Sequence, residues 1–190
     1  MKKLLGLSLL VWLLFLSGCA ISHTYGPYMG KVVDKETEEP MEGAVVFMSF
    51  YTRSGNVGGA TSYYADAVEV LTDVKGDFLI PPYEAKVSRT FDKWALNPNP
   101  IVFKPGYGAY PGHHGTTLSH YKDHELPDNE FVTIKLPKLK TREERVLNLG
   151  NISFTSDIPY EKWRILFNYR NIENIEVGLS PYSSQMINGK

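Results

Sequence analysis

Residues 30–51 read GKVVDKETEEPMEGAVVFMSFY, and this stretch decides the fold. It opens with a short strand candidate at residues 30–34, passes through the mostly polar residues 35–43, and ends in the run AVVFMSFY. A short, unbroken apolar run that is rich in β-branched and aromatic side chains predicts a strand buried on both faces. The stretch therefore predicts two strands joined by a turn.

Short strands and loops alternate through the next part of the chain. Four more strands are expected, at residues 67–72, 77–80, 101–104 and 131–136. Because they are rich in glycine, proline and polar residues, three segments are expected to be loops, at residues 53–62, 84–100 and 106–129. Several short strands separated by turn signals predict a mainly β protein, a β-sandwich.

The pattern changes to that of helices after residue 140. Thr141 and Glu144 have the spacing of a capping box, which satisfies free N–H groups at a helix start, and Gly150 would end this short helix. A second helix is expected to begin near Ser156 or Asp157. One face of this helix is expected to dock against a sheet, and it carries Tyr160, Trp163, Leu166 and Phe167.

The chain begins like an exported protein. Lys2 and Lys3 precede the apolar run of residues 4–16, which has the length of a secretory leader and is too short to span a bilayer. The run ends in Leu16-Ser17-Gly18-Cys19, which resembles the lipobox of bacterial lipoproteins. In such proteins the leader is cleaved before the cysteine, whose sulfur then carries acyl chains such as palmitate. Cys19 is the only cysteine of the sequence, so no intramolecular disulfide can form.

The lipobox resemblance implies a protein that is anchored to a membrane by lipid without spanning it. Residues 1–18 would be the signal peptide, and residues 19–28 a lipidated tether. Loss of the two leader lysines would make the formal net charge of −1 more negative by two. Ala20 follows the cysteine, and in similar lipoproteins a residue other than aspartate at that position favours the outer membrane.

Three motifs resemble those of carboxypeptidase regulatory-like domains, which have a transthyretin-like sandwich. They are Gly30-x-Val32-x-Asp34-x-x-Thr37-x-x-Pro40-x-x-Gly43-Ala44-x-Val46, Thr72-Asp73-x-x-Gly76-x-Phe78-x-Ile80-Pro81 and Lys104-Pro105-Gly106-Tyr107. The last strand of that family resembles Val132-x-Ile134-x-Leu136. The resemblance implies a transthyretin-like β-sandwich at residues 29–137. Residues 138–190 would be a helical extension packed on it.

The turn residues of these motifs have a physical role of their own. Asp34 and Thr37 can accept hydrogen bonds from nearby backbone N–H groups, and Gly43 permits the turn that leads into the next strand. Asp73 and Gly76 are expected to act in the same way in the following hairpin.

Composition and motifs exclude several classes of function. With 43% hydrophobic and 22% charged residues, the 190-residue chain has the composition of an ordered domain. Its near-zero net charge argues against a nucleic-acid partner. The sequence has no glycine-rich phosphate loop, nucleophile elbow or serine triad pattern. Carboxypeptidase regulatory-like domains are generally non-catalytic. The resemblance therefore implies a binding or structural module, without a cofactor, whose long loops contact an envelope protein or polysaccharide.

Four histidines leave a metal-binding alternative open. His113, His114, His120 and His124 fall within one expected loop, and imidazole nitrogens are good ligands for zinc, copper and nickel. The spacing of these histidines is not diagnostic of any known metal site. A polar, solvated loop, which glycine and proline favour here, would explain them without a metal.

Four tyrosines leave a carbohydrate-binding alternative open. Tyr63 and Tyr64 are expected near one loop, and Tyr107 and Tyr110 in another. Exposed aromatic rings can stack on sugars or anchor a protein partner, because large flat rings bury area at low entropic cost. Tyrosines are also common in cores and at the rims of sheets.

Replacement Cys19→Ala should remove the acyl chains and release the protein into a soluble pool outside the cytoplasm. The measurement is cell fractionation, combined with labelling by a fatty-acid probe. Continued membrane retention of the unlabelled variant would contradict the anchor.

Overall fold

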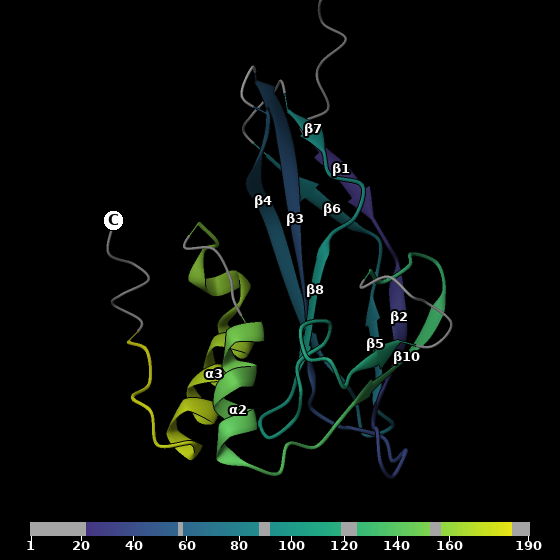
Figure 1. Cartoon of the computed structure of the whole chain (residues 1–190). Helices are drawn as coiled ribbons and strands as arrows, with labels where there is room; N and C mark the ends of the chain where they lie inside the picture. The colour runs from purple at the N-terminus through teal and green to yellow at the C-terminus, as the bar shows by residue number, and fades with distance from the viewer. Residues whose placement is uncertain (1–21, 57–58, 88–91, 119–124, 153–156, 184–190) are drawn as a thin grey trace, which may run out of the picture.

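Figure 1 shows a chain built mainly of strands, with two short helices towards its C-terminal end. The computed structural model describes residues 22–56, 59–87, 92–118, 125–152 and 157–183. Its strands are β1 (Ser22–Tyr25), β2 (Tyr28–Asp34), β3 (Val45–Asn56), β4 (Gly59–Leu71), β5 (Asp77–Ile80), β6 (Tyr83–Lys86), β7 (Lys93–Trp94), β8 (Asn99–Phe103), β9 (Thr117–Leu118) and β10 (Phe131–Leu136). Its helices are α2 (Arg142–Asn148) and α3 (Arg164–Glu176), with 3₁₀ turns η1 (Leu149–Asn151) and η2 (Tyr160–Lys162). The predicted fold class is confirmed.

The strands form three sheets in the described part of the chain. One sheet has the order β5-β2-β10-β9, in which β10 runs parallel to β2 and the other pairs are antiparallel. In the second sheet, β4 pairs with one edge of β3 along its whole length, and β8 and β7 share the other edge. The pair β1-β6 forms the third sheet and extends the β2-β5 pair beyond its end.

Residues 45–50 of strand β3 are buried on both faces, as their apolar sequence predicts. Met48 and Phe50 point into the core between the two larger sheets, together with Ile134 of β10. Val45 and Phe47 point the other way, into a second core that the C-terminal helices close. Because successive side chains of a strand alternate between its faces, an unbroken apolar run needs cover on both sides.

The turns of the quoted motifs form as predicted. The carboxylate of Asp34 accepts hydrogen bonds from the backbone N–H groups of Glu36 (2.8 Å) and Thr37 (3.0 Å). In the next hairpin, Asp73 accepts from the N–H groups of Lys75 and Asp77. Gly76 has a φ of 74°, and a Cβ there would lie 2.5 Å from the carbonyl oxygen of Val32. These turns therefore depend on the residues that the motifs specify.

Helix α2 begins at the predicted capping box, but α3 begins later than expected. Thr141 and Glu144 make both bonds of the box. Residues 160–162 form a 3₁₀ turn, and α3 itself begins at Arg164, whereas Ser156 lies outside the described residues. The reason is a distant cap: the carboxylate of Glu69 on β4 accepts from the N–H groups of Ile165 (2.8 Å) and Leu166 (3.1 Å). The carboxylate also lies at the N-terminal end of the helix, where a negative charge interacts favourably with the helix dipole.

The predicted apolar face of α3 docks on the sheet. Trp163, Leu166 and Phe167 pack in the second core with Phe47 of β3 and Phe103 of β8. The indole of Trp163 is 1% exposed, and its N–H donates to the carbonyl of Ile158 (3.0 Å). The helical extension therefore completes the core around β3.

A buried ion pair fixes the two helices to each other and to the sandwich. Glu173 of α3 is fully buried and accepts two hydrogen bonds of 2.7 Å from the guanidinium of Arg145 on α2. The same carboxylate accepts from the N–H of Gly106, in the turn after β8 (2.7 Å). The hydrogen bond to Glu173 raises the pKa of Arg145, which therefore stays charged. Arg145 also contacts Glu176 at the helix surface.

Several segments differ from the sequence prediction. The described residues of 53–62 are strand, because β3 and β4 extend as a hairpin to Asn56 and Gly59. The expected loop at 84–100 contains β7 and parts of β6 and β8, and the expected loop at 106–129 contains β9. Ser22–Tyr25, assigned to the tether, is strand β1, whose four residues pair with β6. β1 and β7 are strands because they pair with distant strands, and such pairing leaves no local signal in polar or glycine-rich residues. No helix in the described ranges has the length and apolar character needed to cross a bilayer.

Replacement Arg145→Met should lower the free energy of unfolding by roughly 3 kcal/mol, because it leaves the Glu173 carboxylate buried and uncompensated. The measurement is urea unfolding followed by circular dichroism. Glu176→Gln is the matched control, since it removes the half-exposed partner of the same arginine and should cost less than about 1 kcal/mol. Equal losses for the two variants would contradict the role of the buried pair.

Candidate functional site

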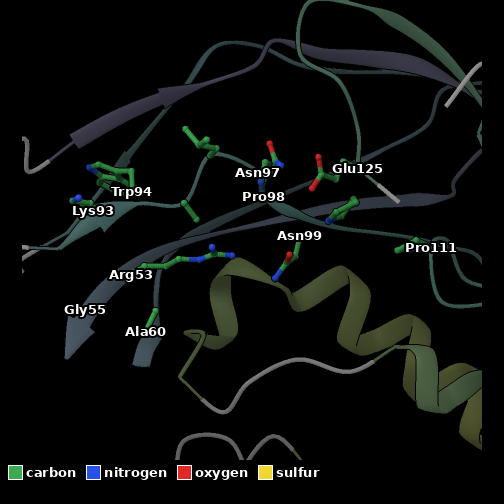
Figure 2. Close-up of a pocket in the computed structure, with 13 residues that line it drawn as sticks. Arg53, Gly55, Ala60, Lys93, Trp94, Asn97, Pro98, Asn99, Pro111 and Glu125 are labelled. Carbon is green, nitrogen blue, oxygen red and sulfur yellow. The ribbon is translucent and has the colours of Figure 1, made fainter. Parts of the chain in front are cut away.

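A groove of about 960 Å³ lies beside the end of β3, where this strand changes its pairing partner (Figure 2). β8 pairs with β3 from Val45 to Ser49, and β7 pairs with it at Thr52 and Arg53. Residues 95–98 leave the sheet between these two pairings and form one wall of the groove. Pro98, Pro100 and Pro111 supply rigid apolar surface to the lining.

Backbone contacts fix this wall in place. The N–H of Ala95 donates to the carbonyl of Tyr51 (2.9 Å), so the chain stays bonded to β3 as it leaves the sheet. The hydroxyl of Thr52 contacts the carboxylate of Asp92 (3.1 Å) just before β7 begins. The edge of β3 is therefore occupied on the groove side by β7, Ala95 and β8.

Strand β1 supports the groove from behind through Trp94. The indole of Trp94 stacks on the imidazole of His23, with ring centroids 5.8 Å apart, and meets Tyr25 edge-on. The phenol of Tyr25 donates to the carbonyl of Ala95 (2.7 Å) and stacks on Phe50 in the core. Burial raises the pKa of Tyr25 to about 12, so this phenol stays protonated as a donor.

Five polar side chains of the groove make no hydrogen bond or ion pair within the described part of the protein. Within the described ranges, no hydrogen bond or ion pair within the protein uses the side-chain polar groups of Arg53, Lys93, Asn97, Asn99 and Glu125. Figure 2 shows Arg53 extending along the groove towards Asn99, with Asn97 and Glu125 on the other side of the view. Polar groups around an apolar floor are typical of a binding site.

Two smaller hollows share part of this lining. One of about 340 Å³ shares Asn97, Pro98 and Glu125 with the groove and reaches Tyr28. Another of about 210 Å³ shares Asn99, Pro100 and Pro111 and extends towards Ile158. The groove is therefore part of a longer hollowed surface that suits an extended ligand better than a compact one.

The four predicted tyrosines do not form an exposed platform. Tyr63 and Tyr64 lie in strand β4 and not in a loop, because the hairpin is longer than expected. Tyr110 is only 3% exposed, and burial raises its pKa to about 12. Tyr107 is half-buried, and none of the four tyrosines lines the groove. The expectation of exposed rings is therefore wrong for Tyr110, which belongs to the core.

The predicted metal loop is only partly described. His120 and His124 lie outside the described residues, as does Cys19. His113 and His114 stack on each other with ring centroids 4.5 Å apart. Nδ1 of His113 accepts from the N–H of Gly115 (3.0 Å), which leaves one nitrogen for other contacts. The described residues contain no group of three or more metal-ligating side chains.

His113 has a clear structural role. Its ring packs so closely on Gly108 that a Cβ there would lie 2.7 Å from the imidazole. A Cβ at Gly115 would lie 3.1 Å from the same ring. Burial, together with the neighbouring His114, lowers the pKa of His113. The neutral imidazole is therefore the form that the fold favours.

A second polar cluster links β4, β6 and η2, and the pKa values of its tyrosine and lysine are not shifted in the direction that catalysis needs. Lys162 pairs with Asp66 at 2.8 Å, and the phenol of Tyr83 donates to the same carboxylate (3.0 Å). Burial raises the pKa of Tyr83, and the hydrogen bond from Lys162 to Asp66 raises the pKa of the lysine. Both shifts oppose the deprotonation that a nucleophile or general base needs.

Sequence reasoning missed the residues that form the groove. The register between β3 and β7 brings Arg53 and Lys93 together, although no local motif links them. The repeated Asn-Pro of residues 97–100 was the one usable signal, since it excludes a continuous helix. Comparison with known proteins adds no further assignment: no family model, curated protein or solved structure matches the chain.

The lowered pKa of His113 predicts a loss of stability in acid. As pH falls below the ordinary histidine pKa of about 6.5, the unfolded chain takes up a proton before the folded one does, so the folded state loses free energy relative to it. The stability difference between the wild type and His113→Gln should therefore shrink between about pH 8 and pH 5. Urea unfolding at each pH measures it.

His114→Gln is the partial control for this experiment, because it removes only the neighbouring charge. Its stability should keep part of the acid dependence. A difference between wild type and His113→Gln that stays constant with pH would contradict the assignment.

Proposed function

We propose that the protein is a non-catalytic lipoprotein of the cell envelope, anchored in the outer membrane through Cys19, which binds a ligand in the groove beside β7 and β8. The resemblance to carboxypeptidase regulatory-like domains supports a binding module, and the lipobox supports the anchor. The observation that carries the proposal is the set of five polar side chains that surround the groove without partners among the described residues.

The chemistry of the lining supports binding over covalent catalysis. None of the described residues that line the groove is a serine, cysteine or histidine. Arginine, lysine and asparagine side chains are instead suited to hold a polar ligand by hydrogen bonds. Glu125 is the one acidic side chain among these described lining residues, so the lining offers no pair of carboxylates.

The position of the groove relative to Cys19 supports a function close to the membrane. Three residues of extended chain span at most about 11 Å, which limits the distance between Cys19 and Ser22. β1 begins at Ser22, and its His23 stacks on Trp94 at the groove wall. A lipid on Cys19 would therefore hold this end of the domain near the bilayer surface.

A photo-crosslinking residue in place of Asn97 should capture an envelope component in living cells. The same residue in place of Lys75, an exposed position in the turn at the other end of the β3-β4 pair, is the matched control. The measurement is the mass of the adduct after irradiation. Adducts from position 97 that are absent from position 75 are expected. Identical adducts from both positions, or none from position 97, would contradict a binding role for the groove.

A further inference from the structure

Two positively charged residues lie opposite each other in the register of the sheet beside the groove. Arg53 on β3 and Lys93 on β7 are direct partners in the register of the sheet, and both are exposed. Like charges at opposed positions destabilise a pair of strands. Neither side chain has an ion-pair partner within the described ranges. A bound anion would supply the negative charge that these two side chains lack among the described residues.

The edge of β3 beside the groove is not free for a peptide that binds as an added strand. This mode of recognition needs a free strand edge with unpaired N–H and C=O groups. On the groove side, β8 pairs with β3 up to Ser49, Tyr51 accepts from Ala95, and β7 pairs with Thr52 and Arg53. A ligand that lies over this edge of β3 is therefore recognised by the side chains of the lining.

The shape and lining of the groove match a chain of sugar rings. A concave surface that continues into two neighbouring hollows fits an extended polymer and not the flat face of a bilayer. Trp94 offers an aromatic ring, on which the apolar face of a sugar can pack. The side chains of Asn97 and Asn99 are both donors and acceptors, which suits hydroxyl groups.

We propose that this groove binds an acidic glycan, a sugar chain that carries carboxylate or phosphate groups. The guanidinium of Arg53 receives an anionic group through two parallel hydrogen bonds, a geometry that lysine cannot provide. Lys93 contributes a second positive charge. The inference rests on the proposed function in one respect, that the groove is the binding site.

The test measures binding of oligogalacturonate to the full lipidated protein in neutral detergent, by isothermal titration calorimetry. The fully methyl-esterified oligomer is the neutral form of the same chain. The double variant Arg53→Gln/Lys93→Gln should weaken binding of the acid form by about tenfold or more. Lys75→Gln, which removes an exposed positive charge elsewhere, should leave binding unchanged.

Two further variants separate ligand contacts from damage to the fold. Arg53→Lys keeps the charge but loses the planar guanidinium that donates two parallel hydrogen bonds, so binding should weaken severalfold. Glu125→Gln removes the acidic side chain from the lining and should tighten binding by about two- to fivefold. A gain of affinity cannot arise from misfolding.

The outcomes are distinct. Binding of oligogalacturonate, or of a phosphorylated dextran in a parallel titration, with loss in the double variant supports an acidic glycan and identifies which anionic group it carries. Failure of both acidic glycans to bind overturns the proposal, as does equal binding of the acid and methyl-esterified forms. Groove-dependent binding only to phosphatidylglycerol vesicles, with none to phosphatidylcholine vesicles, also overturns it in favour of a bilayer surface.

Failure of the glycan proposal is distinguishable from failure of the proposed function. If position 97 still gives a specific crosslink in cells while no acidic glycan binds, the groove is a binding site for another ligand. If position 97 gives no specific crosslink and no acidic glycan binds, both proposals are wrong.

Discussion

The structure depends on the first half of strand β3, residues 45–50, which is buried on both faces. β3 alternates between two cores, with Phe50 in the core between the sheets and Phe47 in the core beneath the helices. Because both faces must be covered, the sandwich needs the C-terminal helices as its third layer. The pair of Arg145 and Glu173 joins these helices at the turn after β8, and Glu69 caps α3 from the neighbouring strand. The helical extension is therefore required for the core and does not merely follow it.

The groove is a consequence of the length of β3. This strand extends beyond the end of β8, so a second short strand, β7, completes its edge, and the residues between them are left as a wall. β1 holds that wall through the contact of His23 with Trp94. The described strand that follows Cys19 most closely is thus the one that supports the groove. Through β1, the proposed anchor at Cys19 is linked directly to the wall of the groove.

Local signals predicted the parts of the fold that depend on neighbouring residues. The Asp34 and Asp73 turns, the doubly buried β3 and the capping box at Thr141 all formed where the sequence indicated. Elements that depend on distant partners were missed. The short polar β1 exists because β6 pairs with it, and α3 begins where Glu69 caps it. The groove was missed for the same reason, since strand register alone brings Arg53 and Lys93 together.

The central claim is that the lipid on Cys19, strand β1 and the groove form one unit at the membrane surface. The proposed cleavage before Cys19 would remove Trp12 and leave two tryptophans, Trp94 at the groove and Trp163 in the core. The direct measurement is fluorescence of the lipidated protein in vesicles whose headgroups carry a nitroxide quencher. The account predicts strong quenching in the wild type and weak quenching in Trp94→Phe, where only the buried Trp163 remains. Equal fractional quenching of the two proteins, or none in either, would contradict it.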